Sequence, residues 1–189
     1  KKGRYKIPIS GYNYNFGVGL SDDLIRLYIY LVADGSYNKE TNLARLRAKK
    51  EKKIKLFRDI LKRLSIIFSD NVQKDGSVYL NFKLPNELID YNIKGLDRKL
   101  MNISTPQFDI ILEAYANTDG YKSNNSTIIY TSKKEEADLL QAMGILNQYK
   151  TTISSRIGHG HSKKESYQIC FTWKDFVEIQ PSKFFKKEK

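Results

Sequence analysis

Residues 50–64 read KEKKIKLFRDILKRL, and this stretch carries the clearest local pattern in the chain. Its apolar residues recur at the spacing of one helical face: Ile54, Phe57, Ile60, Leu61 and Leu64. Since an α-helix brings such positions onto one side, the stretch predicts an amphipathic helix whose apolar face packs on a core. The other faces carry lysine and arginine side chains, so the exposed side of this helix is basic.

Two helices are expected before this stretch. Residues 21–33 place apolar side chains at helical spacing: Leu24, Leu27, Tyr28 and Leu31. Ser21 suits the N-cap position, because its hydroxyl can accept a hydrogen bond from the first turn. A turn at residues 34–36 then leads to a shorter predicted helix over residues 39–48.

After residue 64 the period of the apolar pattern changes from 3.6 to 2. Apolar residues alternate with polar ones in a predicted strand: Val78, Leu80, Phe82 and Leu84. Its partner is expected at residues 66–72, because Asp75-Gly76 lies between them and Asp-Gly favours a tight hairpin turn. The first half is therefore predicted as three helices followed by a hairpin.

The second half repeats this order at an offset of about 80 residues, without sequence identity. A helix is expected to open at Ser104-Thr105-Pro106-Gln107, where the spacing is that of a capping box. Further elements are expected at 127–131 (strand), 132–143 (helix), 151–157 (strand) and 166–173 (strand). The predicted organisation is a module over 1–92, an exposed connector over 93–102, a second module over 103–180 and a basic tail over 181–189.

Charge is distributed very unevenly along the chain. The 189 residues carry 33 Lys and Arg against 21 Asp and Glu, a net charge of +12, and such an excess attracts polyanions. Residues 45–63 contain ten basic residues and two acidic ones, whereas residues 103–149 contain three basic residues and six acidic ones. The first module is thus expected to bind nucleic acid, and the second to mediate assembly into a homodimer.

Composition argues against several other classes of protein. No apolar run approaches the roughly 20 residues that a membrane-spanning helix needs, and residues 1–4 lack a signal-peptide core, so a cytoplasmic protein without a membrane partner is expected. Cys170 is the single cysteine and lies in an alternating apolar stretch, which predicts a buried, inert thiol.

Three helices followed by a two-stranded hairpin, with a basic third helix, resemble the winged-helix DNA-binding domain over residues 20–84. The second half is similar to a degenerate winged helix, and two such modules in tandem resemble the initiator proteins of iteron-type plasmids. The resemblance implies an α+β fold of two winged-helix-like modules, each made of helices followed by a β-hairpin wing. It further implies that the third helix enters the major groove of double-stranded DNA.

The residues expected to contact DNA are the basic ones on that helix, near it, and on the two wings: Arg45, Arg47, Lys49, Lys50, Lys52, Lys53, Lys55, Arg58, Lys62, Lys74, Arg156, Lys163 and Lys164. Most would neutralise phosphates. Arg58, and after it Arg47, are the candidates for reading a base, because arginine pairs bidentately with guanine.

Three enzymatic interpretations stand beside this one. His159-Gly160-His161 could share a metal ion or, with a distant tyrosine, form a relaxase-type nicking site, although flexible wing-tip histidines are favoured. Glu51-Lys52-Lys53 offers half of a restriction-type nuclease motif that is common by chance in lysine-rich sequence. No phosphate-binding glycine loop or Ser-His-Asp set is present.

The sequence therefore predicts a non-enzymatic, sequence-specific double-stranded DNA-binding protein of a plasmid, phage or other mobile element, acting in replication initiation or regulation. No cofactor and no metal site are expected. The alternative is a nicking or relaxase-type enzyme that uses the His-Gly-His segment and a tyrosine.

Overall fold

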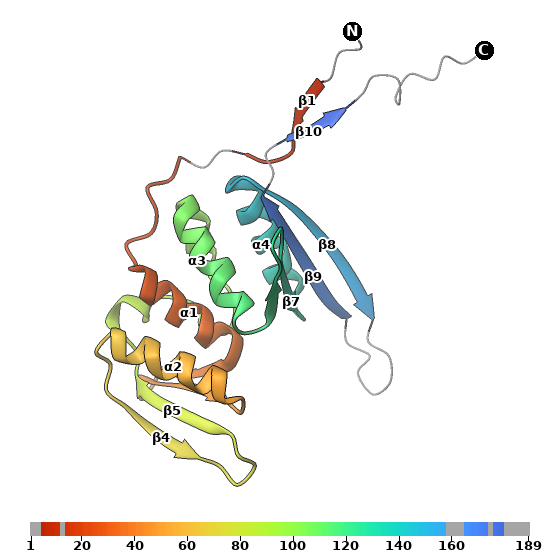
Figure 1. Ribbon diagram of the computed structural model, residues 1–189. Helices are drawn as coiled ribbons and strands as arrows, with labels where there is room; N and C mark the ends of the chain where they lie inside the picture. The colour runs from red at the N-terminus through yellow and green to blue at the C-terminus, as the bar shows by residue number, and fades with distance from the viewer. Residues whose placement is uncertain (1–4, 12–13, 158–164, 174–175, 180–189) are drawn as a thin grey trace, which may run out of the picture.

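The computed structural model describes residues 5–11, 14–157, 165–173 and 176–179, and Figure 1 shows their arrangement. Two successive segments have the same order of elements, α-β-β-α-β-β. The first comprises α1 (Asp22–Asp34), β2 (Gly35–Asn38), β3 (Leu43–Ala48), α2 (Glu51–Arg63), β4 (Phe68–Val72) and β5 (Val78–Lys83). The second comprises α3 (Thr105–Ala116), β6 (Gly120–Lys122), β7 (Thr127–Thr131), α4 (Lys134–Leu146), β8 (Tyr149–Ile157) and β9 (Glu165–Trp173).

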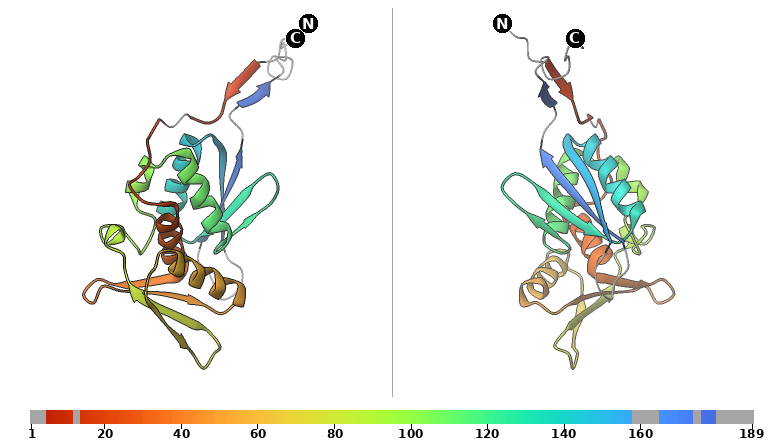
Figure 2. Two further views of the ribbon diagram at one scale, coloured as in Figure 1. Left: turned by 60° about the vertical axis from the view of Figure 1, so that its left-hand side comes forward. Right: turned by 90° about the vertical axis from the view of Figure 1, so that its right-hand side faces the viewer.

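Each segment forms a four-stranded antiparallel sheet with helices on one face. The strand orders are β2-β3-β5-β4 and β6-β7-β9-β8, which are the same topology. Two 3₁₀ turns, η1 (Asn86–Leu88) and η2 (Arg98–Asn102), connect the repeats. Strand β1 (Tyr5–Pro8) pairs with β10 (Phe176–Ile179) in a separate ribbon, which Figure 2 shows standing away from the two sheets.

The predicted winged-helix fold is wrong, and residues 39–48 show why. They contain no helix: strand β3 occupies residues 43–48, with Ala44, Leu46 and Ala48 buried and the residues between them exposed. Alanine, leucine and arginine all favour helices intrinsically, and this propensity predicted a helix here. The apolar and charged residues nevertheless alternate, and pairing with β2 and β5 holds the segment as a strand. The second repeat likewise has β6 and β7 at this position. Each module therefore contains two helices packed on a four-stranded sheet, whereas a winged helix would have three helices and a two-stranded wing.

Other expectations from the sequence are confirmed. Helices α1, α2, α3 and α4 and the β4–β5 hairpin lie where the periodicity placed them. Ser21 caps α1 by accepting a hydrogen bond from the Leu24 N–H. Gly76 adopts the positive φ that the tight turn requires, at 78°. In the capping box of α3, the Ser104 N–H donates to Gln107 Oε1 at 3.3 Å.

Helix α1 lies at the centre of the molecule. Six of its residues are buried, on all sides of the helix: Ile25, Leu27, Tyr28, Ile29, Tyr30 and Leu31. One side packs against α3 of the other repeat, and the opposite side packs against α2 and its sheet. A helix that is apolar all round is typical of a core position, and this one holds the two repeats together.

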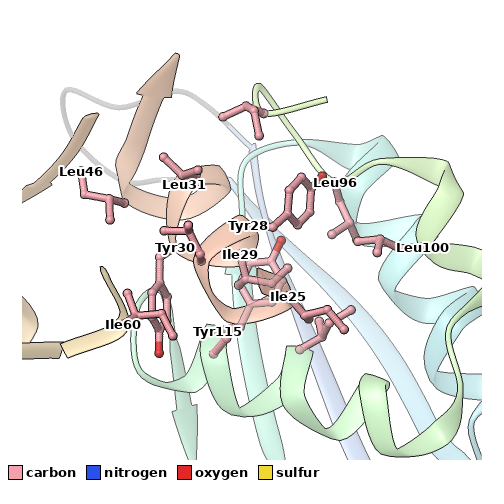
Figure 3. Packing of buried hydrophobic residues seen from close by; sticks show 14 of the residues in the cluster. Ile25, Tyr28, Ile29, Tyr30, Leu31, Leu46, Ile60, Leu96, Leu100 and Tyr115 are labelled. Atoms are coloured by element: carbon pink, nitrogen blue, oxygen red, sulfur yellow. The ribbon is translucent and has the colours of Figure 1, made fainter. Parts of the chain in front are cut away.

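The segment between the repeats belongs to this core. Ile93, Leu96 and Leu100 are buried, and Figure 3 shows Tyr28 on the side of α1 that faces Leu96 and Leu100. The Tyr28 hydroxyl lies 2.9 Å from the carbonyl oxygens of both Asn92 and Gly95. The connector predicted as exposed over residues 93–102 is therefore packed into the core at Ile93, Leu96 and Leu100. The predicted division of the chain into domains stays a prediction. Among the described residues no helix has the length and apolar character to cross a bilayer.

Candidate active site and nucleic-acid interface

Two aspartates occupy equivalent positions at the ends of the paired helices. Asp34 is the last residue of α1, and Asp119 lies in the turn that follows α3. Each is followed by a glycine that begins the next strand. A Cβ on Gly35 would lie 2.6 Å from the Leu31 carbonyl oxygen, and a Cβ on Gly120 would lie 2.6 Å from the Ile128 carbonyl oxygen. The close turn from helix to strand therefore requires glycine, and it sets the aspartate before it at the helix end.

Lys53 connects these two aspartates. Its Nζ lies 2.6 Å from Asp34 Oδ2 and 3.8 Å from Asp119 Oδ1, and its side chain is 20% exposed. Asp34 Oδ2 is buried and, within the described residues, shows no hydrogen bond, so the lysine charge is what compensates it. The packing of α1 on α3 thus brings together two carboxylates that are 85 positions apart in the sequence, with a cationic group between them.

Burial and neighbouring carboxylates make it harder to ionise Asp119 than an ordinary aspartate. Burial raises the pKa of Asp119, and the charges of Asp34 and Glu136 raise it further, while Lys53 acts in the opposite direction. A second carboxylate close by therefore disfavours ionisation of Asp119 unless a cation is present. This arrangement suits the binding of a positive charge.

A pocket of about 660 Å³ opens beside Asp34. Six cationic residues from β3, from the turn after it and from the start of α2 line it: Arg47, Lys49, Lys50, Lys52, Lys53 and Lys55. Asn117 and Thr118 from the second repeat form part of the wall, so the pocket lies where the repeats meet. Its charge suits a polyanion such as a nucleic-acid backbone.

A second group of basic residues, which shares Arg47 with the pocket, lies on the outer face of the first sheet. Arg45 and Arg47 point away from the helices, and their guanidinium groups lie 5.0 and 5.6 Å from the centre of the Tyr79 ring. Arg45 Nε donates to Asn81 Oδ1 at 2.8 Å, and Arg47 Nη2 lies 3.1 Å from Asp75 Oδ2. These contacts hold the arginines in defined positions on an open strand surface.

The residues predicted from the sequence therefore divide between several surfaces. Helix α2 packs its apolar residues on the first sheet (Figure 1), and because the fold is not a winged helix, the reason for placing α2 in the major groove no longer holds. The DNA contacts expected of its exposed basic residues stay predictions. Its residue Arg58, the candidate for reading a base, is tied to Asp70, with Nε 3.0 Å from Oδ2. Lys62 is exposed on α2, and Lys74 lies in the β4–β5 turn.

The second sheet carries its own polar outer face. Lys150, Thr152, Ser154 and Arg156 alternate along β8 with the side chains that face the helices. Cys170 pairs with Thr152 on this outer face and is partly exposed, so the expectation of a buried thiol is wrong. Lys163, Lys164, His159 and His161 lie outside the described residues.

Asp34 and Asp119 are not among the site residues predicted from the sequence. The available signal was the repetition of Asp-Gly after an apolar helix, at residues 34–35 and 119–120. The first of these steps was interpreted only as a turn.

No family model and no curated protein matches the sequence. Solved structures do match the fold. Full-length DUF199/WhiA from Thermotoga maritima superposes with a TM-score of 0.56 at 13% identity, covering 84% of this chain and 53% of that one. The N-terminal LAGLIDADG domain of DUF199/WhiA gives 0.53 at 11% identity, covering 78% and 74%. This chain therefore spans about half the length of the full-length WhiA chain that it matches.

The same fold occurs in a nuclease. Variants of the homing endonuclease I-DmoI superpose with a TM-score of 0.54 at 15% identity, covering 80% of this chain and 89% of theirs. I-DmoI in complex with DNA and Mn gives 0.50 at 15% identity, covering 80% and 91%. These matches replace the winged-helix and plasmid-initiator resemblance. They also overturn the expectation of a non-enzymatic protein, which rested on that resemblance, because the fold found instead is shared with an endonuclease.

Proposed function

We propose that this protein is a metal-dependent endonuclease of double-stranded DNA in which Asp34 and Asp119 are the active-site carboxylates. The observation that carries the proposal is the contact of one ammonium group, Lys53 Nζ, with both carboxylates at the interface of the repeats. This places a cation-binding pair beside a strongly basic pocket. Cleavage of a phosphodiester needs both features, since positive charge must meet the phosphate where negative charge develops.

The donor set fits a divalent cation that is shared with the substrate. Asp34 Oδ2 is a buried oxygen that lies 2.6 Å from the Lys53 ammonium group, and Asp119 is 44% exposed. Within the described ranges no group of three or more His, Cys, Asp or Glu side chains is gathered closely enough to hold a metal alone. Mg²⁺ is commonly held by one or two carboxylates together with substrate phosphates, which is the arrangement this site offers. A bound cation of this kind would polarise the scissile phosphate and the attacking water.

The outer faces of the two sheets are the proposed DNA-contacting surface. Arg45 and Arg47 on β3 and Lys150 and Arg156 on β8 project from strands that a major groove can accommodate. Support comes from I-DmoI, which shares this fold and has been solved in complex with DNA and Mn and with DNA and Ca. The lysines around the start of α2 would add phosphate contacts near the carboxylates.

Two finer expectations remain predictions. The first is that the protein acts in the replication initiation or regulation of a plasmid, phage or other mobile element. The other is a homodimer formed through the second repeat. The site already combines one aspartate from each repeat of a single chain, so the proposed cleavage does not depend on a second copy.

The test begins by finding the DNA target. Genomic fragments retained by the protein in Ca²⁺ are sequenced, and the recovered duplex is then incubated with Mg²⁺ or Mn²⁺. We expect cleavage by the wild-type protein, and a loss of about 100-fold or more in Asp34→Asn and in Asp119→Asn, with binding retained. Asp59→Asn is the matched control, because Asp59 is an exposed acid that lines the same pocket without contacting Lys53 in the structure.

Two outcomes would overturn the proposal. One is specific binding without cleavage under any of these cations. The other is cleavage that survives both aspartate substitutions and is lost in a His159→Ala/His161→Ala variant, which would transfer the activity to the His-Gly-His segment.

A further inference from the structure

A hollow separate from the basic pocket lies at one end of the second sheet. Its volume is about 660 Å³, which is in the range of small-molecule sites. Helix α3 contributes Asp109 to its wall, and the turn after β6 and the paired ends of β8 and β9 contribute most of the rest. Asp119 precedes β6, and neither it nor Asp34 lines the hollow. The hollow is therefore distinct from the candidate active site.

One wall of the hollow is aromatic. Tyr149 pairs with Trp173 across β8 and β9, and their ring centres lie 5.1 Å apart at an angle of 85°. Trp173 continues the alternation of buried residues along β9, yet its side chain is 58% exposed. The wall faces away from Lys150 and Arg156 on the outer face of the sheet. An exposed indole beside a second ring offers a surface on which a planar base can stack.

A carboxylate is held in place beside this wall. The Tyr149 hydroxyl donates to Asp109 Oδ1 at 2.7 Å. Burial and the hydrogen bond to Asp109 raise the pKa of Tyr149, so its hydroxyl stays protonated and keeps donating. The two oxygens of a carboxylate can accept about four hydrogen bonds, so this contact leaves Asp109 able to accept from a ligand.

The rim of the hollow carries a cation and two amides. Lys122 is exposed on β6, and Asn124 and Asn125 are exposed in the turn that follows. Ser123 and Ser126 close this turn, with the Ser123 N–H donating to the Ser126 carbonyl oxygen at 2.8 Å and the two hydroxyl oxygens 2.9 Å apart. Of the described residues that line the hollow, Asp109 and Lys122 alone carry a charge. A planar polar ligand with an anionic tail matches this arrangement.

We propose that the hollow binds the guanine base of a nucleotide. The base stacks on Trp173, its adjacent N1–H and N2–H groups donate to the Asp109 carboxylate, and the phosphate meets Lys122. Adenine has an acceptor at N1, so the carboxylate disfavours it. A ligand cation would also be attracted to the aromatic rings, but Lys122 would repel it.

Two sources can present this base, a free guanine nucleotide and an unpaired guanine in a DNA strand. Both offer the same stacking face, donors and phosphate. The proposal does not depend on the endonuclease function, because its residues belong neither to the carboxylate pair nor to the outer faces of the sheets.

Trp173 is the single tryptophan of the chain, so its fluorescence reports on the hollow directly. The full chain is titrated with GMP and with AMP, and N-acetyltryptophanamide corrects for absorption by the nucleotides. We expect a saturable change in emission, with GMP bound about tenfold or more tightly than AMP. Asp109→Asn should remove this preference. Asp59→Asn, which changes an exposed aspartate outside the hollow, should retain it.

Two further variants separate the parts of the site. Lys122→Met should weaken GMP severalfold and leave guanosine unchanged, because only GMP carries a phosphate. Trp173→Leu should weaken GMP about tenfold or more, measured by calorimetry because the variant has no tryptophan. Melting temperatures are measured for every variant. Lys122→Met changes an exposed side chain, so it remains informative if Asp109→Asn is unstable.

The source of the base is tested with single-stranded oligothymidylate that carries one guanine or none. Tighter binding of the guanine-bearing strand than of GMP identifies a DNA strand as the ligand, and the reverse identifies the free nucleotide. Absence of a saturable response to GMP and to this strand overturns the proposal. Equal affinity for GMP and AMP overturns it too, as does a guanine preference that survives Asp109→Asn. A protein that binds guanine as expected and cuts no DNA overturns only the endonuclease function.

Discussion

Lys53 and Glu136 occupy the same position in two helices of the same backbone, the third residue of α2 and of α4, and they carry opposite charges. Lys53 reaches the two aspartates at the interface, whereas Glu136 turns to Tyr115 and Thr131 in the interior of its own repeat. The two repeats share a topology, but they carry side chains of opposite charge at this equivalent position.

Acidification should abolish cleavage at a higher pH than an ordinary aspartate would cause. Burial, Asp34 and Glu136 raise the pKa of Asp119, and a carboxylate must be ionised to hold a divalent cation. Glu136→Gln removes one of these negative charges, so the acidic limb of the rate profile should move to lower pH. Glu135→Gln, on the exposed neighbour, should leave it in place. An unchanged limb in Glu136→Gln would show that Asp119 does not control the profile.

The same pKa shift predicts the sign of a stability effect. A carboxyl whose pKa is raised on folding binds its proton more tightly in the folded state than in the unfolded state. Asp119 should therefore favour the folded state at low pH, and this contribution should disappear as the pH rises through its raised pKa. Urea unfolding of wild type and Asp119→Asn across pH measures it, and a difference independent of pH would contradict the prediction.

Alanine at Gly35 or Gly120 should destabilise the fold by about 1–3 kcal/mol, because the added Cβ would meet backbone atoms that cannot move aside easily. Gly19→Ala is the matched control, since a Cβ there has no neighbour within 4 Å. Thermal unfolding of the three variants measures the difference. If all three melt at the same temperature, the helix-to-strand turns do not need glycine, and the placement of the aspartates must have another cause.

Tyr28→Phe should destabilise the protein by about 1–3 kcal/mol, because it removes a buried hydroxyl that serves three backbone groups. That oxygen lies 2.9 Å from two carbonyl oxygens of the connecting segment and accepts from the Asp97 N–H at 2.7 Å. Tyr37→Phe is the control, because among the described residues its partly exposed hydroxyl bonds only to Asn42 Oδ1. Urea unfolding compares the two. Equal and small effects would mean that the connecting segment is held by its apolar contacts alone.

Arg45→Ala combined with Arg47→Ala should weaken duplex binding about tenfold or more and reduce the salt dependence of affinity by the loss of two phosphate or base contacts. Both residues project from the outer face of the first sheet. Lys62→Ala on the far end of α2 is the matched control and should change affinity little. Titrations at two salt concentrations measure both effects. A larger loss in Lys62→Ala would return α2 to the role of the main contact element.

Local patterns in the sequence determined the helices, the β4–β5 hairpin and the basic stretch. Residues 50–64 repeat their apolar side chains at helical spacing, and Asp75-Gly76 suits a tight turn, and both features depend only on neighbours along the chain. The strand at 43–48 depends instead on pairing with β2 and β5, so its alanine and leucine residues suggested a helix.

The candidate site was decided by the tertiary structure alone. Asp34 and Asp119 each precede a glycine, and such Asp-Gly pairs are common in turns, so nothing in the local sequence marks either residue. They are 85 positions apart. They meet because α1 is apolar on every side and must bury its second face, which it does against α3. The same packing turns Lys53 toward both carboxylates and leaves Arg45 and Arg47 on an open sheet. A single basic stretch of sequence thus becomes two surfaces, since strands and helices direct their side chains by different periods.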